Sequence, residues 1–203
     1  MAQIHGHLGV VILGAGASAR MGRPKLLLPW RGTTVIGQLL SQWRALGAGQ
    51  IAGVLRANDD ALAAELDRLH HPKSDRIENP QPERGMFSSI VCAVNWNGWR
   101  EGISNWAVVL GDQPHLRMET LRQLVEFSAQ NVDAICQPAF GGRAGHPVIL
   151  PQRTFMELKS SGAATMKDFL NRSAAPRVQL VINDPGLTLD LDTPEDYQRL
   201  TSH

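Results

Sequence analysis

A run of small residues followed by two cations stands near the start of the sequence. Residues 13–16 read Leu-Gly-Ala-Gly, and Arg20 and Lys25 follow within nine residues. Successive backbone N–H groups in a loop of small residues can approach and bind a phosphate closely. Because Arg20 and Lys25 add positive charge beside that loop, we expect a phosphate site here, with ordinary surface cations as the alternative.

A carboxylate stands at the end of an apolar segment in the middle of the chain. Residues 106–110 (Trp-Ala-Val-Val-Leu) are typical of a buried strand, and Gly111 and Asp112 follow directly. Mg²⁺ prefers one or two carboxylates together with phosphate oxygens and water, and it can neutralise charge on a phosphate under attack. Asp112 is therefore the first candidate for a metal ligand, with a plain turn as the alternative.

A second carboxylate is expected from residues 187–192 (Leu-Thr-Leu-Asp-Leu-Asp). Their alternation predicts a strand that carries Asp190 and Asp192 on one face. Thr193 and Asp196 mark the start of a final helix. We favour Asp192 as the metal ligand because it stands next to that helix start, but either carboxylate could instead cap the helix or face solvent.

Two further segments carry polar side chains that could contact a ligand. Residues 79–90 form a proline-rich loop that enters a predicted helix with Ser88 and Ser89 in its first turn, where a phosphate or a base edge binds well. Capping alone would also explain Ser88. Residues 141–147 form a flexible basic loop that contains His146. A structural role for His146 is as consistent with the pattern as a ligand contact.

The elements that must position these residues alternate along the chain. Apolar segments typical of buried strands recur at residues 8–13, 51–55, 106–110 and 132–136, and helix-period segments lie between them at 35–46, 61–69, 88–95 and 118–129. This alternation predicts an α/β fold of three layers, a mostly parallel sheet with helices on both faces. Ligands then bind at the carboxyl ends of the strands, near the topological switch point.

Length and charge limit the classes of function. The 203 residues, 43% of them hydrophobic, favour one domain over residues 1–203. Residues 1–58 hold six basic and no acidic residues, whereas the remainder holds 14 basic and 19 acidic ones, so an anionic ligand is expected at the N-terminal part. The net charge of +1 argues against a broad nucleic-acid surface.

Localisation signals and cysteine chemistry are not evident in the sequence. It shows no apolar segment near the roughly 20 residues that span a bilayer, and no signal peptide at its start. We therefore expect a cytoplasmic protein without membrane contact. Cys92 and Cys136 lack the spacing of a zinc site or a redox motif, so we interpret both as reduced, buried packing residues.

A dinucleotide-binding oxidoreductase is the first alternative to weigh. Gly14, Gly16 and Ala19 satisfy the spacing of the dinucleotide fingerprint, which by itself is a weak signal. In that motif a helix follows the glycines immediately, and an acidic residue for the ribose follows about 20 residues later. Two prolines lie within residues 20–29 and no acidic residue occurs before Asp59, so this interpretation is disfavoured. A P-loop is disfavoured too, because no Gly-Lys-Ser/Thr follows.

The string Leu-Gly-Ala-Gly-Ala-Ser-Ala-Arg-Met-Gly-Arg-Pro-Lys, residues 13–25, resembles the signature of the MobA-like nucleotidyltransferases. Segments similar to the family's Asn and Gly-Ser-Ser loop, Gly-Asp-x-Pro, Gly-His-Pro and Asp-Thr-Pro-Glu-Asp follow in the expected order. The resemblance implies a Rossmann-like nucleotidyltransferase fold, and a nucleotide site made of Leu13, Gly14, Ala15, Gly16, Lys25, Asn79, Gly85, Ser88, Ser89 and Gly111. It also implies catalytic roles for Arg20, Lys25 and Asp112, Mg²⁺ on Asp112 and Asp192, and acceptor contact by His146.

The reaction implied by this resemblance moves a nucleoside monophosphate from an NTP to the terminal phosphate of molybdopterin or molybdenum cofactor. No protein nucleophile is needed, so positioning and electrostatics supply the catalysis. Ala15, and the two residues Arg23-Pro24 before Lys25, resemble the cytidylyl branch, although Gly14 and Pro24 depart from its usual residues. A guanylyl or other nucleotidyltransferase, or a carrier that hands the cofactor to an apo-molybdoenzyme, remains as the alternative.

Overall fold

The apolar, β-branched segments form the strands of a central sheet. The structure, a computed structural model, describes residues 7–202. The sheet has eight strands, namely β1 (Leu8–Leu13), β4 (Gln50–Arg56), β5 (Arg76–Asn79), β6 (Asn105–Leu110), β7 (Ile135–Phe140), β8 (Arg143–Ala144), β9 (Val148–Pro151) and β10 (Arg177–Val181). A separate short hairpin pairs β2 (Pro29–Trp30) with β3 (Thr33–Thr34).

Strand order places β1 in the interior of the sheet. The order is β10-β7-β9-β6-β1-β4-β5, with β8 paired to β7. The pairs β1–β4, β1–β6, β4–β5 and β7–β10 are parallel, whereas β9 runs antiparallel between β6 and β7. The chain therefore proceeds from β1 to β4 on one side and returns to β6 on the other. This reversal makes the carboxyl end of β1 a topological switch point.

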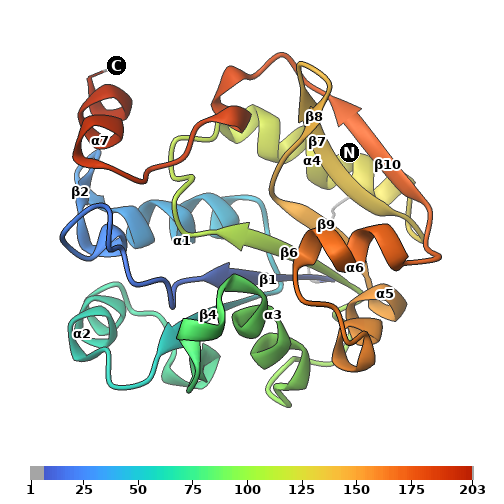
Figure 1. Ribbon diagram of the computed structural model, residues 1–203, viewed down its shortest axis with the longest axis horizontal. Helices are drawn as coiled ribbons and strands as arrows, with labels where there is room; N and C mark the ends of the chain where they lie inside the picture. The colour runs from blue at the N-terminus through green and yellow to red at the C-terminus, as the bar shows by residue number, and fades with distance from the viewer. Residues whose placement is uncertain (1–6, 203) are drawn as a thin grey trace.

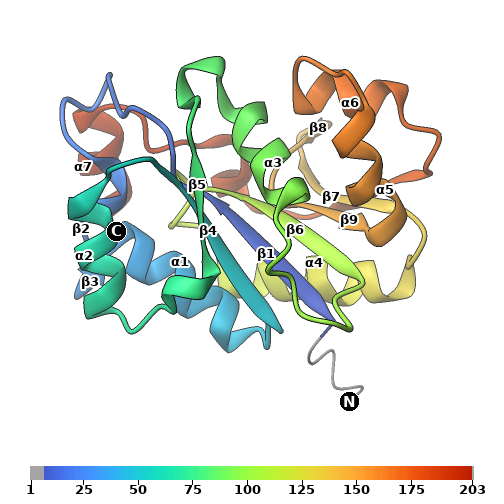
Figure 2. The ribbon, with the colours of Figure 1, turned by 90° about the horizontal axis from the view of Figure 1, so that it is seen from below.

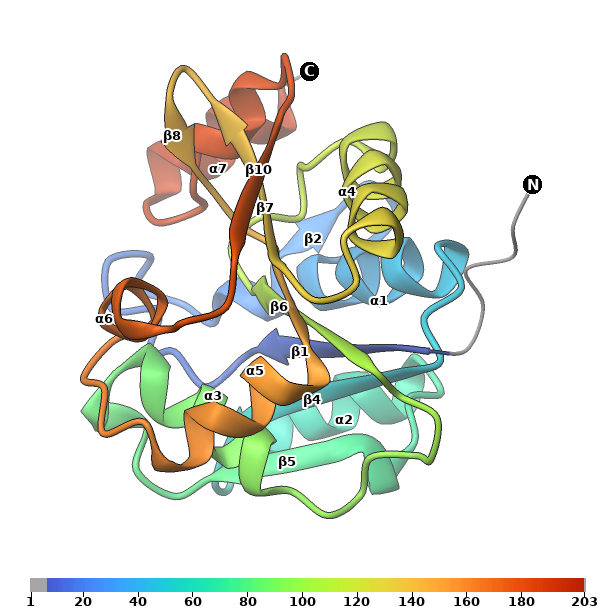
Figure 3. The same cartoon turned by 90° about the vertical axis from the view of Figure 1, so that its right-hand side faces the viewer.

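Helices cover both faces of the sheet, so the predicted three-layer α/β fold is confirmed. One face packs against α1 (Val35–Ala45), α2 (Asp60–Arg68) and α4 (Met118–Gln130). The other face packs against α3 (Met86–Asn95), α5 (Gln152–Glu157) and α6 (Met166–Arg172). Figures 2 and 3 show the sheet between α1 and α4 on one side and α3 on the other. A final helix, α7 (Pro194–Thr201), lies beside β2 at the edge of the molecule (Figure 1).

The side chains of β1 alternate between the two cores, as the pleat of a strand requires. Val10 and Ile12 join the cluster beneath α1 and α4, whereas Val11 and Leu13 join the cluster beneath α3. All four are buried. Burying a side chain of this size stabilises the fold by about 1.5–3 kcal/mol, so β1 is anchored from both sides. The loop that follows Leu13 is consequently held in a fixed place.

Three expectations about local structure need correction. The strand predicted at 132–136 instead spans Ile135–Phe140, because Val132 is 58% exposed and lies in a turn. Residues 187–192 form no strand. Asp184 accepts a hydrogen bond from the Gly186 amide and starts a 3₁₀ turn, Pro185–Thr188, after which the chain is irregular. Cys136 is buried as expected, but Cys92 is only half-buried.

In the part of the chain that the structure describes, no helix is long and apolar enough to cross a membrane.

Candidate active site

The glycine loop and Asp112 come together because β1 and β6 are neighbours. Leu13, the last residue of β1, is paired with Leu110, the last residue of β6. A cavity of about 330 Å³, here called the glycine-loop cavity, opens at these two strand ends. Its walls are residues 13–18, Lys25, Leu26, Pro82, Gly85, Met86, Ser89 and residues 110–112. A volume of this order is suited to a small ligand.

Backbone contacts fix the shape of the glycine loop. The Gly14 amide donates to the Val54 carbonyl at 2.8 Å, and a Cβ atom at Gly14 would lie 3.0 Å from that oxygen. Further along, the Ser18 hydroxyl accepts a hydrogen bond from the Lys25 amide at 3.1 Å, which returns the chain to the cavity. Among the described residues no helix begins directly after the glycines. A 3₁₀ turn at Lys25–Leu27 comes first, unlike in a dinucleotide-binding unit.

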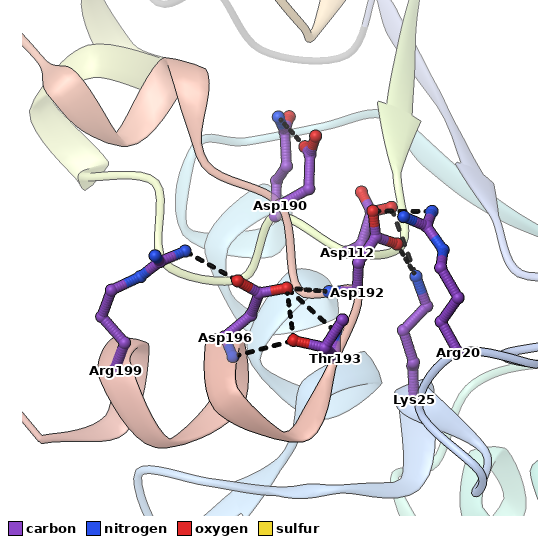
Figure 4. Close-up of polar contacts among 9 residues, drawn as sticks. Arg20, Lys25, Asp112, Asp190, Asp192, Thr193, Asp196 and Arg199 are labelled. Atoms are coloured by element: carbon purple, nitrogen blue, oxygen red, sulfur yellow. Dashed lines mark hydrogen bonds and ion pairs between the residues drawn. The ribbon is translucent and has the colours of Figure 1, made fainter.

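Lys25 joins two carboxylates at the edge of the glycine-loop cavity. Its Nζ lies 2.9 Å from Asp192 Oδ1 and 3.4 Å from Asp112 Oδ2. Arg20 Nη2 lies 2.8 Å from Asp192 Oδ2 (Figure 4). The Lys25 side chain is 16% exposed, whereas that of Arg20 is 72% exposed. The Lys25 contacts are therefore the better shielded from water and salt.

The environment of Asp112 fits a divalent metal ion. Burial raises the pKa of Asp112, the Lys25 ammonium opposes that shift, and the neighbouring Asp190 and Asp192 carboxylates add to it. Asp112 Oδ1 is buried without a hydrogen-bond partner in the structure. A carboxylate oxygen that is desolvated and unpaired can be satisfied by a cation. Asp112 and Asp192 together match the one or two carboxylates that Mg²⁺ takes beside phosphate and water.

No larger set of protein ligands is present within residues 7–202, where no three His, Cys, Asp or Glu side chains converge on one point. Such a set is needed for an all-protein cage but not for a metal that is shared with a phosphate ligand.

Asp190 lies apart from this carboxylate pair. Figure 4 shows it pointing away from Asp112 and Asp192, and its Oδ1 accepts a hydrogen bond from Gln113 Nε2 at 3.0 Å. Asp190 and Gln113 line a second cavity of about 340 Å³, here called the His146 cavity, which also includes Leu110, residues 143–146, Leu187 and Thr188. Leu110 lines both cavities, whereas Asp112 lines only the glycine-loop cavity and Gln113 only the His146 cavity.

His146 is neutral at physiological pH in this setting. Burial lowers its pKa to about 4, against the opposing charge of Asp190. Its Nε2 is buried without a hydrogen-bond partner in the structure. Gln113 Oε1 is likewise buried and unpaired. Two unsatisfied polar atoms on the walls of one cavity are costly unless a ligand or water completes them.

The predicted contacts from the proline-rich loop divide into two groups. Gly85 and Ser89 line the glycine-loop cavity, but Asn79 and Ser88 do not. Asn79 is 1% exposed, and its Nδ2 donates to the hydroxyls of Ser88 and Ser89 at 2.8 and 3.0 Å. Its Oδ1 accepts from the Gln81 amide at 2.9 Å. Asn79 and Ser88 therefore set the shape of the loop rather than forming the cavity wall.

Several residues at the two cavities carried no sequence signal of their own. Leu26, Pro82 and Met86 add apolar surface to the glycine-loop cavity, and Gln113 connects the Asp112 loop to Asp190. Gln113 follows Asp112 directly and is 5% exposed. A polar residue beside a carboxylate at a strand end could have drawn attention to that position, but its partner Asp190 is 77 residues away.

Comparisons with known proteins agree with the fold and extend over most of the chain. The MobA-like NTP transferase domain family matches residues 10–178. The molybdenum cofactor cytidylyltransferase of Escherichia coli (strain K12) is 26% identical over 92% of each chain. Nicotine blue oxidoreductase of Paenarthrobacter nicotinovorans is 29% identical over 94% of each chain.

A solved structure of similar size comes from Mycobacterium tuberculosis H37Rv. Its protein Rv0371c superimposes with a TM-score of 0.76 and 27% identity, over 98% of this chain and 99% of that one. A manganese complex of Rv0371c gives a TM-score of 0.70 and 25% identity over 97% and 98% of the two chains. Related chains of this fold therefore include one that binds a divalent metal.

Proposed function

The chain belongs to the MobA-like NTP transferase family, and from this premise we propose that it transfers CMP from CTP to the terminal phosphate of a molybdopterin-type acceptor. The observation that carries the proposal is the position of Lys25. It lies in the wall of the glycine-loop cavity and joins Asp112 and Asp192 there. A cation between two carboxylates at one cavity, with a second, polar cavity that shares Leu110, suits a reaction that joins two phosphate-bearing substrates.

The nucleotide is assigned to the glycine-loop cavity. The backbone of residues 14–16 offers close approach because a Cβ atom at Gly16 would meet no atom within 4 Å, so space remains in front of the loop. Leu26, Pro82 and Met86 supply apolar contact for a base, and Ser89 supplies a hydroxyl. Lys25 and the exposed Arg20 hold the β and γ phosphates and stabilise the pyrophosphate that leaves.

The metal is assigned to Asp112 and Asp192, on the strength of the buried, unpaired Asp112 Oδ1. When bound there, Mg²⁺ would withdraw charge from the α-phosphate. The protein groups position the substrates: an oxygen of the acceptor phosphate attacks the α-phosphorus, the bond to the β-phosphate oxygen breaks, and pyrophosphate departs. Because the acceptor oxygen is already anionic, no side chain needs to remove a proton.

The acceptor is assigned to the His146 cavity. Neutral His146 and the unpaired Gln113 Oε1 offer hydrogen bonds, and the carboxylate of Asp190 accepts N–H donors. Arg143 adds an exposed positive charge at the rim. A ring system rich in N–H groups with an attached phosphate matches this set of groups. The cytidylyltransferase relative, by its name, acts in the same cofactor chemistry.

Oxidoreduction is the second candidate, because the nicotine blue oxidoreductase relative covers the chain equally well. The local structure favours nucleotidyl transfer over it. In this chain a 3₁₀ turn that begins at Lys25 follows the glycine loop. In a dinucleotide-binding unit the N-terminus of an α-helix stands at that place and binds the pyrophosphate. Measuring NAD(P)H oxidation beside pyrophosphate release, in the experiment below, distinguishes the two functions.

The test is pyrophosphate release by the purified protein with Mg²⁺ and molybdopterin or its molybdenum-loaded form. CTP, GTP and ATP are compared, and Asp112→Asn is compared with the exposed carboxylate variant Glu126→Gln as a matched control. We expect release from CTP that is lost in Asp112→Asn and kept in Glu126→Gln.

Three results would count against the proposal. Selective pyrophosphate release from GTP or ATP would show that the nucleotide is not CTP. Pyrophosphate release that requires a different acceptor would show that the acceptor is not of the molybdopterin type. Pterin- or dye-dependent oxidation of NADPH, with no release from any NTP, would replace nucleotidyl transfer by oxidoreduction.

A further inference from the structure

The carboxylate of Asp192 is carried by the C-terminal segment of the chain. Residues 179–203 lie beyond the part that matches the family. The segment reaches the site through two backbone contacts: Ile182 N donates to the Ala139 carbonyl at 2.9 Å, and Leu191 N donates to the Asp112 carbonyl at 3.0 Å. Asp192 follows immediately and leads into α7.

The start of α7 and Asp192 form one rigid unit. Thr193 caps the helix by accepting from the Asp196 amide at 3.2 Å, while Asp196 Oδ2 accepts from the amides of Thr193 at 2.9 Å and Asp192 at 3.3 Å. Such a capping box satisfies otherwise free amides at the helix start. Any displacement of α7 would therefore displace the Asp192 carboxylate.

Tyr197 packs the start of α7 against residues 23–30, the segment that follows the glycine loop. Its hydroxyl donates to the Pro29 carbonyl at 2.7 Å. Its ring lies 6.5 Å from that of Trp30, centroid to centroid, at an interplanar angle of 60°. The guanidinium carbon of Arg23 lies 5.6 Å from the centroid of the Tyr197 ring, within the range of a cation–π contact. Figure 1 shows α7 lying against β2, to which Pro29 and Trp30 belong.

These contacts join the two segments that must meet at the site. Arg23 lies between Arg20 and Lys25 in the sequence. Tyr197 therefore contacts the same segment that carries the two cations of the site. Apart from Tyr197, the apolar anchor of α7 is Leu200, its one buried residue. A helix with so little burial is expected to detach readily when a fastening side chain is lost.

We propose that Tyr197 is a positioning residue, which holds Asp192 opposite Asp112 so that the pair can bind a divalent metal. This inference rests on the metal site of the proposed function. Tyr197 touches neither carboxylate, and it acts by docking α7 against Arg23, Pro29 and Trp30.

The test measures Mn²⁺ affinity of the full chain, without nucleotide, by the electron paramagnetic resonance signal of free Mn²⁺. We expect Tyr197→Ala to weaken Mn²⁺ binding about tenfold, because both the hydrogen bond and the ring contacts are lost. Tyr197→Phe keeps the ring, so a loss of only about threefold is expected. The neighbouring exposed residue supplies the control, and Gln198→Ala should bind Mn²⁺ like the wild type.

Hydrogen–deuterium exchange reports the same docking without a metal. Peptides that cover residues 187–196 should exchange faster in Tyr197→Ala than in the wild type, while peptides from β1 and β6 should not change. Wild-type Mn²⁺ affinity in both Tyr197 variants would overturn the proposal, as would unchanged exchange at 187–196 in a folded Tyr197→Ala. A wild-type protein that binds no Mn²⁺ would overturn it as well. Pyrophosphate release by the wild type then shows separately whether the proposed function stands.

Discussion

The glycine-loop cavity and the His146 cavity, which share Leu110, are built in different ways. The glycine-loop cavity is formed mostly by backbone and small or apolar side chains from the ends of β1 and β6 and the start of α3. The polar side chains of the His146 cavity come from three segments that are far apart in sequence, namely Gln113, then Arg143 and His146, then Thr188 and Asp190. Backbone walls are fixed by strand pairing, whereas side-chain walls depend on how separate loops dock.

This difference has a consequence for substrate recognition. A backbone site binds what all nucleotides share, the phosphates and the ribose, with few side chains that vary. A side-chain site can change its ligand by single substitutions. We therefore expect nucleotide binding to be the more robust property of this chain, and acceptor choice to be the more easily altered one.

The largest effect is expected at Lys25, which lines the glycine-loop cavity and joins Asp112 to Asp192. Lys25→Met should lower kcat for pyrophosphate release about 1000-fold, because it removes a shielded charge from the phosphates and leaves the Asp112 carboxylate without its cation. Arg20→Ala should lower kcat only about tenfold, because the Arg20 side chain is 72% exposed and its charge is screened by water. Steady-state kinetics of both variants test this, and equal losses would contradict the distinction between the two cations.

Acid should act on the His146 cavity. The pKa of His146 is lowered from 6.5 to about 4 by burial, so between these pH values the unfolded chain binds more protons than the folded one. The free energy of unfolding should therefore fall by up to about 3 kcal/mol as the pH drops from about 6.5 to about 4.

Urea unfolding of the wild type and His146→Gln at pH 7 and pH 4.5 measures this contribution. The variant should lose less stability on acidification than the wild type. Asp112, whose pKa is raised by burial, contributes in the opposite sense but equally in both proteins. The exposed His70 provides a control, since His70→Asn should follow the wild type. An unchanged pH dependence in His146→Gln would show that His146 is not the responsible group.

Substitutions of the two C-terminal carboxylates, Asp190 and Asp192, should affect different ligands. Asp192→Asn should weaken Mn²⁺ binding about 100-fold, because it removes a proposed ligand that already contacts Lys25 and Arg20. Asp190→Asn should leave Mn²⁺ affinity within about twofold but raise the KM for the acceptor about tenfold, because Asp190 accepts from Gln113 in the His146 cavity. Loss of Mn²⁺ affinity in Asp190→Asn instead would exchange the two assignments.

The smallest effects are expected from glycines in the backbone-built cavity. A Cβ atom at Gly111 would lie 2.7 Å from the Leu13 carbonyl oxygen, so Gly111→Ala should cost about 1–3 kcal/mol of unfolding free energy. At Gly16 a Cβ atom meets nothing within 4 Å, and Gly16→Ala should change stability by less than about 0.5 kcal/mol. Urea titrations compare the pair, and similar losses would mean that the Gly16 loop is more tightly held than its surroundings indicate.

The sequence predicted most where one local pattern fixes the structure. Residues 8–13 were expected as a buried strand and form β1 over the same residues, because continuous apolar, β-branched side chains favour a strand covered on both faces. The final helix likewise starts at Thr193 as predicted, where Thr193 and Asp196, three residues apart, form a capping box. Glycine at 14 and 16 marked the loop.

Prediction failed where docking overrides a local pattern. Residues 187–192 alternate like a strand but form none, because Asp184 starts a 3₁₀ turn over Pro185–Thr188. The nucleotide contacts of Asn79 and Ser88 stay a prediction, although neither residue lines the glycine-loop cavity and the Asn79 side chain is engaged within its own loop. The partners of Tyr197, more than 160 residues away, had no signal in the sequence.

The sequence by itself determined the layers, the carboxyl ends of β1 and β6 and the small-residue loop, because periodicity and glycine act over a few neighbouring residues. The sequence favoured Asp192 over Asp190 only by its place next to the helix start, and the tertiary structure gives the two carboxylates different partners. Alternation alone gives both carboxylates the same face, whereas the hydrogen bond from Leu191 N to the Asp112 carbonyl and the docking of α7 place Asp192 against Lys25 and leave Asp190 with Gln113. That choice depends on contacts between segments about 80 to 170 residues apart, which no local pattern encodes.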